Sequence, residues 1–252
     1  MNRRRRVAVT VALGIVGVWA IKLGRLGRSV GVYGTYWSQS QGVPGGLVYV
    51  ALGDSAAQAI GASRPERGYV SVLAERMRQQ SGQEVLVVNL SRSGATVRDV
   101  VDKQLPQLGA LRPDLVTVAV GGNDVPLYDA ASFAVAAQEL TAALPVGSYL
   151  ADVPYYMHGR WEKHAVEAGA RLIAGAVAHQ LHPVALHDAE RDRGNRAMLT
   201  DFAADWFHPN DRGHRVWADA FWAALAQSKV LVGPSGRQTS QVPGPVSRVE
   251  VS

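Results

Sequence analysis

Four short segments of the chain carry the residue types that nucleophilic acyl chemistry needs. A serine hydroxyl becomes a useful nucleophile when an imidazole accepts its proton, and the oxyanion that forms needs preorganised hydrogen-bond donors. Candidates for these roles are Ser55, His208 with Asp205, Gly94 and Asn123. We therefore ask whether the chain can bring them to one place.

Asp205 and His208 are separated by three positions, in the stretch Asp205–Asn210. This spacing lets the carboxylate turn back onto Nδ1 of the imidazole, which fixes the tautomer and leaves Nε2 to act as a base. The alternative is structural, namely a helix-capping aspartate beside a surface histidine. The pair alone does not decide between these interpretations.

The other candidates also have structural alternatives. Gly53 permits a tight turn from which Ser55 can project its hydroxyl, but serine is also a common helix cap. Gly94 can bring a backbone N–H close to a substrate oxygen. Asn123 follows two glycines and offers an amide donor, although such residues also form ordinary turns. If none of the four segments had a catalytic role, each would have to be a helix cap or a turn that resembles a catalytic motif by coincidence.

The elements that would position these residues alternate regularly along the chain. Apolar runs predict strands at Leu47–Leu52, Val85–Leu90, Leu115–Val120, Ser148–Val153 and Pro183–His187. Helical patterns occupy Tyr69–Gln80, Thr96–Gln104, Ala130–Leu144, Trp161–Leu181 and Asp211–Gln227. This alternation predicts an α/β protein, a three-layer α/β/α sandwich with a mainly parallel sheet of about five strands. Ligands of such sheets bind beyond the carboxyl ends of the strands, where the candidate residues lie.

The ordered blocks in this sequence resemble those of the SGNH, or GDSL-type, hydrolases. The blocks are Gly53-Asp54-Ser55, Gly94, Gly121-Gly122-Asn123-Asp124 and Asp205-Trp206-Phe207-His208. The resemblance spans about Leu47 to Gln227 and reaches neither terminus. Ala56 stands where the family usually has leucine after its GDS block. The resemblance implies the flavodoxin-like sandwich of that family.

The resemblance also implies a role for each candidate residue. Ser55 would be the nucleophile, His208 the general base and later the acid, and Asp205 the orienting carboxylate. The backbone N–H groups of Ser55 and Gly94 and the side chain of Asn123 would form the oxyanion hole. Asp54 and Asp124 would brace their turns.

An apolar segment after the fourth predicted strand would complete the site. We expect Tyr155, Tyr156 and Met157 to hang over the active edge of the sheet and to bind substrate, although they can equally pack their own loop. His214 is expected to be a packing or surface residue.

The motifs of other chemistries do not occur in the sequence. The chain contains no cysteine, so thiol nucleophiles and Cys-ligated metals are excluded. It has no phosphate-loop or H-E-x-x-H motif, and no G-x-S-x-G nucleophile elbow follows any of the predicted strands. His179 and His182 are three apart, but no third ligand lies near them in sequence. We expect neither a metal nor a cofactor.

Charge is concentrated at the N-terminus. The net charge is +5, yet residues 1–53 hold seven basic and no acidic residues, so the rest of the chain is nearly neutral and lacks the footprint of a nucleic-acid-binding protein. Arg3–Arg6 precede an uncharged stretch from Val7 to Ile21, which is short for a membrane span at roughly 22 Å against about 30 Å. This outline predicts a retained signal anchor, or a cleaved signal peptide; a buried helix is the other interpretation.

These features predict the organisation of the whole chain. We expect a signal anchor or signal peptide at 1–28, a Gly- and Ser-rich tether at 29–46, a hydrolase domain at 47–231 and a flexible tail at 232–252. The catalytic domain would be membrane-anchored and exported, or secreted.

The predicted function is a serine esterase or lipase that acts on small-molecule, lipid or glycan esters through an acyl-enzyme. Two alternatives stay open. One is an acyltransferase or deacetylase that acts on cell-envelope glycans or lipids, and the other is a non-catalytic ligand-binding module that uses the same cleft.

Overall fold

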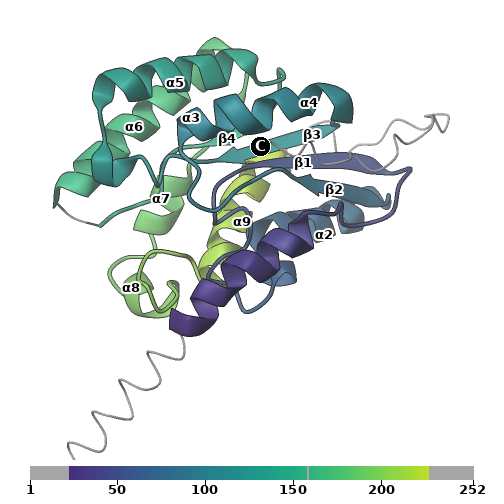
Figure 1. The fold of residues 1–252 in the computed structure, drawn as a ribbon, viewed down its shortest axis with the longest axis horizontal. Helices are drawn as coiled ribbons and strands as arrows, with labels where there is room; N and C mark the ends of the chain where they lie inside the picture. The colour runs from purple at the N-terminus through teal and green to yellow at the C-terminus, as the bar shows by residue number, and fades with distance from the viewer. Residues whose placement is uncertain (1–22, 158, 227–252) are drawn as a thin grey trace, which may run out of the picture.

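A computed structural model describes residues 23–157 and 159–226 of the chain (Figure 1). Its strands are β1 (Leu47–Gly53), β2 (Val85–Asn89), β3 (Leu115–Ala119), β4 (Tyr149–Ala151) and β5 (His182–Val184). Its helices include α2 (Tyr69–Ser81), α3 (Val97–Asp99), α4 (Leu105–Leu111), α5 (Ala130–Ala143), α6 (Gly159–Ala178), α7 (Leu186–Arg191), α8 (Ala197–Thr200) and α9 (Asp211–Leu225). A further helical stretch covers residues 23–37.

The five strands form one parallel sheet in the order β2-β1-β3-β4-β5. The chain moves outward from β1 to β2 and then returns to the other side of β1 to form β3. The switch point of the sheet therefore lies between β1 and β3, where ligands of open α/β sheets bind. In this register Gly53 at the end of β1 lies opposite Ala119 at the end of β3, so the loops after these strands leave the same edge together.

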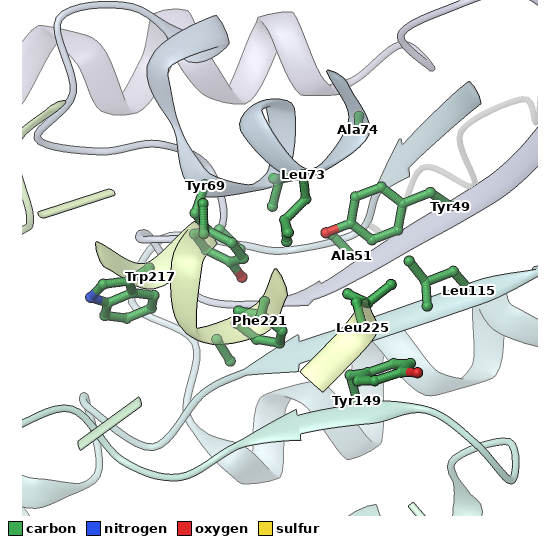
Figure 2. Packing of buried hydrophobic residues seen from close by; sticks show 14 of the residues in the cluster. Tyr49, Ala51, Tyr69, Leu73, Ala74, Leu115, Tyr149, Trp217, Phe221 and Leu225 are labelled. Carbon is green, nitrogen blue, oxygen red and sulfur yellow. The ribbon is translucent and has the colours of Figure 1, made fainter. Parts of the chain in front are cut away.

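Side chains of β1 alternate between two apolar cores, because successive residues of a strand point to opposite faces. Tyr49 and Ala51 face the core under α2 and α9, and Figure 2 shows Leu73, Phe221 and Leu225 packed beside them. The phenol of Tyr49 is fully buried and its hydroxyl is 2.8 Å from Oγ1 of Thr117 on β3.

The opposite face of the sheet carries the second core. Val50 and Leu52 of β1 lie there against helices α3, α4, α5 and α6. Helices thus cover both faces of the sheet, as Figure 1 shows, and the predicted three-layer α/β/α sandwich is confirmed.

The N-terminal region differs from the prediction. The predicted tether, residues 29–46, begins as part of the helical stretch 23–37, and this helix packs on the domain. The buried Tyr33 donates its hydroxyl to the carbonyl of Ala62 (3.0 Å), and the buried Trp37 donates Nε1 to the carbonyl of Gln58 (3.2 Å). Tyr33 and Trp37 are therefore core residues of the domain.

The rest of the predicted tether also belongs to the domain. Gln41 exchanges two backbone hydrogen bonds with Val87, at 2.9 and 2.7 Å, and so covers the exposed edge of β2. The folded domain thus starts before the predicted boundary at Leu47.

The predicted helix Thr96–Gln104 is also more complex than expected. A short α3 is followed by a wider turn of π-type hydrogen bonding over Val100–Gln104, and α4 then continues to Leu111. Pro106 has no N–H to donate to the preceding turn, which explains the change in hydrogen bonding.

Two short helices, α7 and α8, follow β5 and were not predicted. Strand β5 ends at Val184, so Leu186 and His187 of the predicted fifth strand belong to α7.

Across residues 23–157 and 159–226, no helix combines the length and the apolar character needed to cross a bilayer. The predicted anchor stretch Val7–Ile21 and all of the predicted tail, residues 232–252, lie outside the described residues.

Candidate active site

The structure brings Ser55, His208 and Asp205 into one hydrogen-bonded chain. His208 Nε2 lies 2.8 Å from Oγ of Ser55, although 153 positions separate the two residues. On the other side of the ring, Nδ1 lies 2.5 Å from Oδ2 of Asp205. Ser55 is buried to 5% exposure, whereas His208 and Asp205 are partly open to solvent. The order of groups is that of a nucleophile, a base and an orienting carboxylate.

Asp205 is held in place by its own loop. Its Oδ1 accepts backbone hydrogen bonds from Phe207 (3.1 Å) and His208 (3.0 Å), so both carboxylate oxygens are engaged. Burial raises the pKa of Asp205, but the hydrogen bonds from the side chain and backbone of His208 lower it by more, and the pKa ends below its usual value. The carboxylate therefore stays ionised near neutral pH and favours a proton on Nδ1 of His208.

Ser55 is positioned by a series of turns rather than by a helix. It is not a helix cap: backbone N–H groups of Gln58 and Ile60 both donate to the carbonyl of Ser55, and the next regular α-helix begins at Tyr69. Ala59 adopts a left-handed conformation within these turns. A tight coil therefore presents the serine at the end of β1.

Gly61 lets this coil meet the histidine loop. A Cβ on Gly61 would collide with the carbonyl oxygen of Pro209 and would lie 2.9 Å from Cβ of His208. The residue also has a φ of +94°, a conformation that favours glycine. The contact between segments from opposite ends of the domain thus depends on the absence of a side chain at this position.

Gly94 and Asn123 lie beside each other at the sheet edge. Asn123 donates one amide hydrogen from Nδ2 to the carbonyl of Ala95 (3.0 Å), so the second hydrogen of that nitrogen can serve another acceptor. Gly94 has a φ of +80°, and a Cβ built on it would meet no atom within 4 Å, so its backbone faces open space.

Three buried amide side chains that the sequence analysis did not single out hold these loops together. Gln58 donates to the carbonyl of Ser91 and accepts hydrogen bonds from the backbone and hydroxyl of Ser93. Asn89 donates Nδ2 to the carbonyl of Ala57 (2.7 Å). Gln104 satisfies both the N–H (2.9 Å) and the carbonyl (2.8 Å) of Gly53. No sequence signal marked them, because most glutamines and asparagines lie on surfaces.

Asp54 and Asp124 contact the backbone of the loops around the site. Asp54 accepts from the N–H of Ala56 (2.9 Å), and Asp124 accepts from the N–H of Val97 (3.1 Å). Burial raises the pKa of each carboxyl to about 6, and the charge of Asp54 adds to the shift of Asp124. Both carboxyls thus brace the turns that flank Ser55 and Asn123.

Of the three predicted substrate residues, the structure brings Tyr156 to the site. Its hydroxyl donates to the carbonyl of Gly122 (2.6 Å), and its ring lies 6.3 Å from that of Phe207, the neighbour of His208. Tyr155 and Met157 instead line a small cavity of about 10 Å³ beside Glu190. Neither residue contacts the triad through a hydrogen bond in the described part of the chain.

Two of the other histidines have structural contacts. His214 is fully buried on α9, and its Nε2 donates to the carbonyl of Ile60 (3.1 Å). His182 stacks on Tyr149, with ring centroids 4.6 Å apart. Within residues 23–157 and 159–226, no three histidine, aspartate or glutamate side chains are grouped so as to hold a metal ion.

The sequence model of the GDSL-like Lipase/Acylhydrolase family matches residues 51–216, which hold the whole candidate site. No curated protein matches the chain.

Solved structures similar to the chain include three ester-directed or hydrolytic enzymes. The alpha/beta hydrolase LAE5 from the Lake Arreo metagenome shares 24% identity, with 71% of this chain and 95% of that chain covered and a TM-score of 0.61. A variant of the acetyl xylan esterase Axe2 from Geobacillus stearothermophilus shares 24% identity over 71% and 94% of the two chains, with a TM-score of 0.58. The lipase Lip_vut3 from the goat rumen metagenome shares 19% identity over 71% and 97%, with a TM-score of 0.57. At such identities the likeness establishes the fold.

Proposed function

The chain belongs to the GDSL-like lipase/acylhydrolase family and is an ester-hydrolysing enzyme, and on this premise we propose that it cleaves carboxylic esters through an acyl-enzyme on Ser55. The observation that carries the proposal is the 2.8 Å contact between Oγ of Ser55 and Nε2 of His208. At that distance the imidazole can take the hydroxyl proton as the oxygen attacks.

In the first step, Oγ of Ser55 bonds to the ester carbonyl carbon and its proton passes to Nε2 of His208. The carbonyl oxygen becomes an oxyanion, which the N–H groups of Ser55 and Gly94 and Nδ2 of Asn123 stabilise. Asp205 stabilises the imidazolium through Nδ1. His208 then protonates the leaving alcohol as the C–O bond breaks, and the acyl group stays on Ser55.

In the second step, water attacks the acyl-enzyme in the same way as Ser55 attacked the ester. His208 takes a proton from water, the resulting hydroxide attacks the acyl carbon, and Ser55 leaves with the proton returned from Nε2. The free acid and the restored serine are the products. Water is the second substrate, and no redox partner is required.

The test is Ser55→Ala. This variant should lose hydrolysis of short acyl esters to the background rate and keep the circular dichroism spectrum and melting temperature of the wild type. A serine-directed fluorophosphonate should label the wild type and not the variant. Unchanged hydrolysis by Ser55→Ala would contradict the mechanism, and an unlabelled, inactive wild type would favour a binding module.

A panel of esters addresses the substrate class. It should contain acetylated xylo-oligosaccharide, because a similar structure is that of an acetyl xylan esterase, together with aryl esters of increasing acyl length. Adding competing alcohols and analysing the products separates hydrolysis from acyl transfer, since transfer yields a new ester.

We also propose that the N-terminal sequence tethers the enzyme to a membrane with its catalytic domain exported. The support is the order of Arg3–Arg6, the uncharged stretch Val7–Ile21 and Lys22 in the sequence. Fractionation of cells that express the full chain, or a chain that begins at Leu23, should find the first in membranes and the second in the soluble fraction. Recovery of both in the soluble fraction would contradict the tether.

A further inference from the structure

Large apolar side chains are exposed around the loop that carries His208. Leu199 on α8 is 77% exposed, and Met198, Trp206 and Phe207 are also exposed. Leu23, at the start of the helical stretch 23–37, is exposed as well. Figure 1 shows this helix, in purple, beside α8. We call these five residues the α8 face. Contiguous apolar side chains on a surface mark an interaction site.

A groove of about 690 Å³ lies between the helical stretch 23–37 and the segment that contains α8. Its apolar lining comes from both sides, namely Leu26, Tyr33, Met198, Leu199, Phe202 and Trp206. Trp206 borders the groove, whereas the next residue, Phe207, packs edge-on against the ring of His208, with centroids 5.0 Å apart. The α8 face therefore reaches the catalytic histidine.

The charges around this face are mainly positive. Residues 23–37 and 193–212 hold five arginines and three aspartates. Each aspartate is engaged: Asp201 pairs with Arg193 and Arg212, Asp205 binds His208, and Asp211 accepts from Ser63.

Three of the five arginines remain available to a partner. Arg25, Arg28 and Arg196 are exposed and form no ion pair with any residue of the described chain. Exposed apolar side chains with unpaired arginines around them complement the surface of an anionic bilayer. The apolar side chains can insert at the boundary of the acyl chains, and the arginines can pair with the negatively charged headgroups.

The chain enters the domain at the same face. The helical stretch 23–37 starts the described structure, and the sequence just before it contains the uncharged stretch Val7–Ile21 flanked by Arg3–Arg6 and Lys22. A domain that emerges from a membrane at residue 23 would have the α8 face next to that membrane.

We propose that the α8 face docks on the surface of an anionic phospholipid bilayer and presents the active site to esters held in that bilayer. The part of this inference that concerns the substrate rests on the proposed ester hydrolysis, whereas docking on the bilayer can be tested without measuring hydrolysis. It narrows the substrate class to esters that partition into a membrane surface.

The first experiment measures docking with a single fluorescent label. Because the chain has no cysteine, Leu199→Cys gives one thiol on the α8 face. Val146→Cys is the matched control, since Val146 is 72% exposed in the loop before β4, at the opposite edge of the sheet. Each full-length variant is labelled and reconstituted in vesicles of equal parts phosphatidylcholine and phosphatidylglycerol, with and without a nitroxide-bearing lipid.

The label at position 199 should be quenched by the nitroxide lipid and should shift its emission to the blue, and the label at 146 should show neither change. Equal quenching at both positions, or none at 199, would overturn the proposal. If the label at position 199 were quenched as strongly in vesicles of pure phosphatidylcholine as in the mixed vesicles, the proposed preference for an anionic bilayer would be overturned. A blue shift that grows with protein concentration in lipid-free detergent would assign the face to a second copy of the chain and overturn the proposal.

The second experiment measures the consequence for catalysis. Leu199→Asp should hydrolyse a soluble acetyl ester at the wild-type rate, but should hydrolyse a fluorogenic ester embedded in the anionic vesicles about tenfold more slowly, as expected when one leucine contact with lipid is lost. Val146→Asp should match the wild type on both substrates. Equal rates for Leu199→Asp on the embedded ester would overturn the proposal. A wild type inactive on both esters would contradict the proposed function, and the quenching experiment would still decide docking.

Discussion

At the scale of single residues, the hydroxyl of Ser55 and the carboxylate of Asp205 contact opposite nitrogens of one imidazole. Oδ2 of Asp205 accepts a hydrogen bond from Nδ1 of His208, and Oδ1 accepts two more from backbone N–H groups of the loop that carries His208. The carboxylate therefore fixes the orientation of the ring as well as its charge.

Asp205→Asn should lower kcat by roughly 1,000- to 10,000-fold, because an amide can present its N–H to Nδ1 and stabilise the wrong tautomer. The protein should remain folded. Steady-state kinetics on a soluble ester measure the effect. The control is Asp192→Asn, an exposed aspartate in a neighbouring turn, which should retain full activity. A loss of less than tenfold in Asp205→Asn would remove this carboxylate from the mechanism.

Asn123→Ala should lower kcat by roughly 100- to 1,000-fold with little change in KM, because an oxyanion donor acts mainly in the transition state. The same assay serves, and the exposed Asn195 gives the matched control Asn195→Ala. A change confined to KM would show that Asn123 binds substrate instead.

Sequence motifs marked the candidate catalytic residues more readily than the residues that hold their loops in place. Ser55, Asn123 and the Asp205–His208 pair carry recognisable spacing and lie at the sheet edge as expected. Gln58 and Gln104 have no such spacing, and their importance comes from the backbone groups that the tertiary fold places beside them. Only coordinates could reveal that contribution.

At the scale of elements, the site depends on how closely the coil after β1 approaches the loop before α9. Gly61→Ala should destabilise the protein by about 1–3 kcal/mol, because the new methyl group overpacks against Pro209 and His208 at a position with positive φ. Activity should fall as well, since the methyl group displaces the histidine.

Gly82→Ala is the control for Gly61→Ala. Gly82 also has a positive φ, of +65°, but a Cβ there meets nothing within 4 Å. Gly82→Ala should therefore destabilise the protein by about 1 kcal/mol and leave activity unchanged. Chemical denaturation and ester hydrolysis of both variants test the pair, and wild-type activity in Gly61→Ala would contradict the steric argument.

The buried His214 on α9 should make the stability of the protein sensitive to acid. Burial lowers its pKa to about 4, from 6.5 in the unfolded chain. The unfolded state therefore takes up the proton first: the stabilising contribution is complete above pH 6.5 and is lost as the pH falls toward 4. Between pH 7 and pH 5 the free energy of unfolding should lose about 2 kcal/mol from this group.

Because burial raises the pKa values of Asp54 and Asp124, these carboxyls shift stability in the opposite direction over the same range. The contribution of His214 is therefore isolated by comparing the wild type with His214→Asn at both pH values, and by an NMR titration of the imidazole in the wild type. An imidazole pKa above 6 in the folded protein would refute this prediction.

Elements with a clear apolar pattern could be predicted from the sequence. The five strands stand out as apolar runs and helices α2, α5, α6 and α9 as periodic patterns, and their predicted ranges overlap those in the structure. Helix α8 has four residues, too few for a periodic pattern. The π-type turn at Val100–Gln104 ends on Gln104, whose contact with the end of β1 is long-range and is not encoded by local sequence.

At the scale of the whole molecule, the domain includes the helical stretch 23–37. Composition alone suggested a tether there, because glycine and serine are frequent, but Tyr33 and Trp37 are buried against the coil after β1. Burial of these two aromatic side chains holds the segment on the domain despite its glycine and serine content. Whatever membrane tether exists must therefore end before this helix.

Trp37→Ala should destabilise the domain by about 3–5 kcal/mol, the usual cost of removing a buried tryptophan side chain. Val32→Ala on the same helix should change stability by less than about 0.5 kcal/mol, because Val32 is 62% exposed. Thermal and urea unfolding measure both variants. Equal stability of Trp37→Ala and the wild type would restore the interpretation of this segment as a tether.

The separation of 153 positions between Ser55 and His208 has a consequence for biosynthesis. A ribosome produces Ser55 early and His208 only shortly before α9, so under the proposed mechanism incomplete chains contain a serine that no imidazole activates. The growing polypeptide is thus expected to be inert toward cellular esters until nearly all of the domain has been translated. A protease that cuts the chain between α8 and His208, so that the C-terminal fragment is lost, would return the enzyme to that silent condition without touching Ser55.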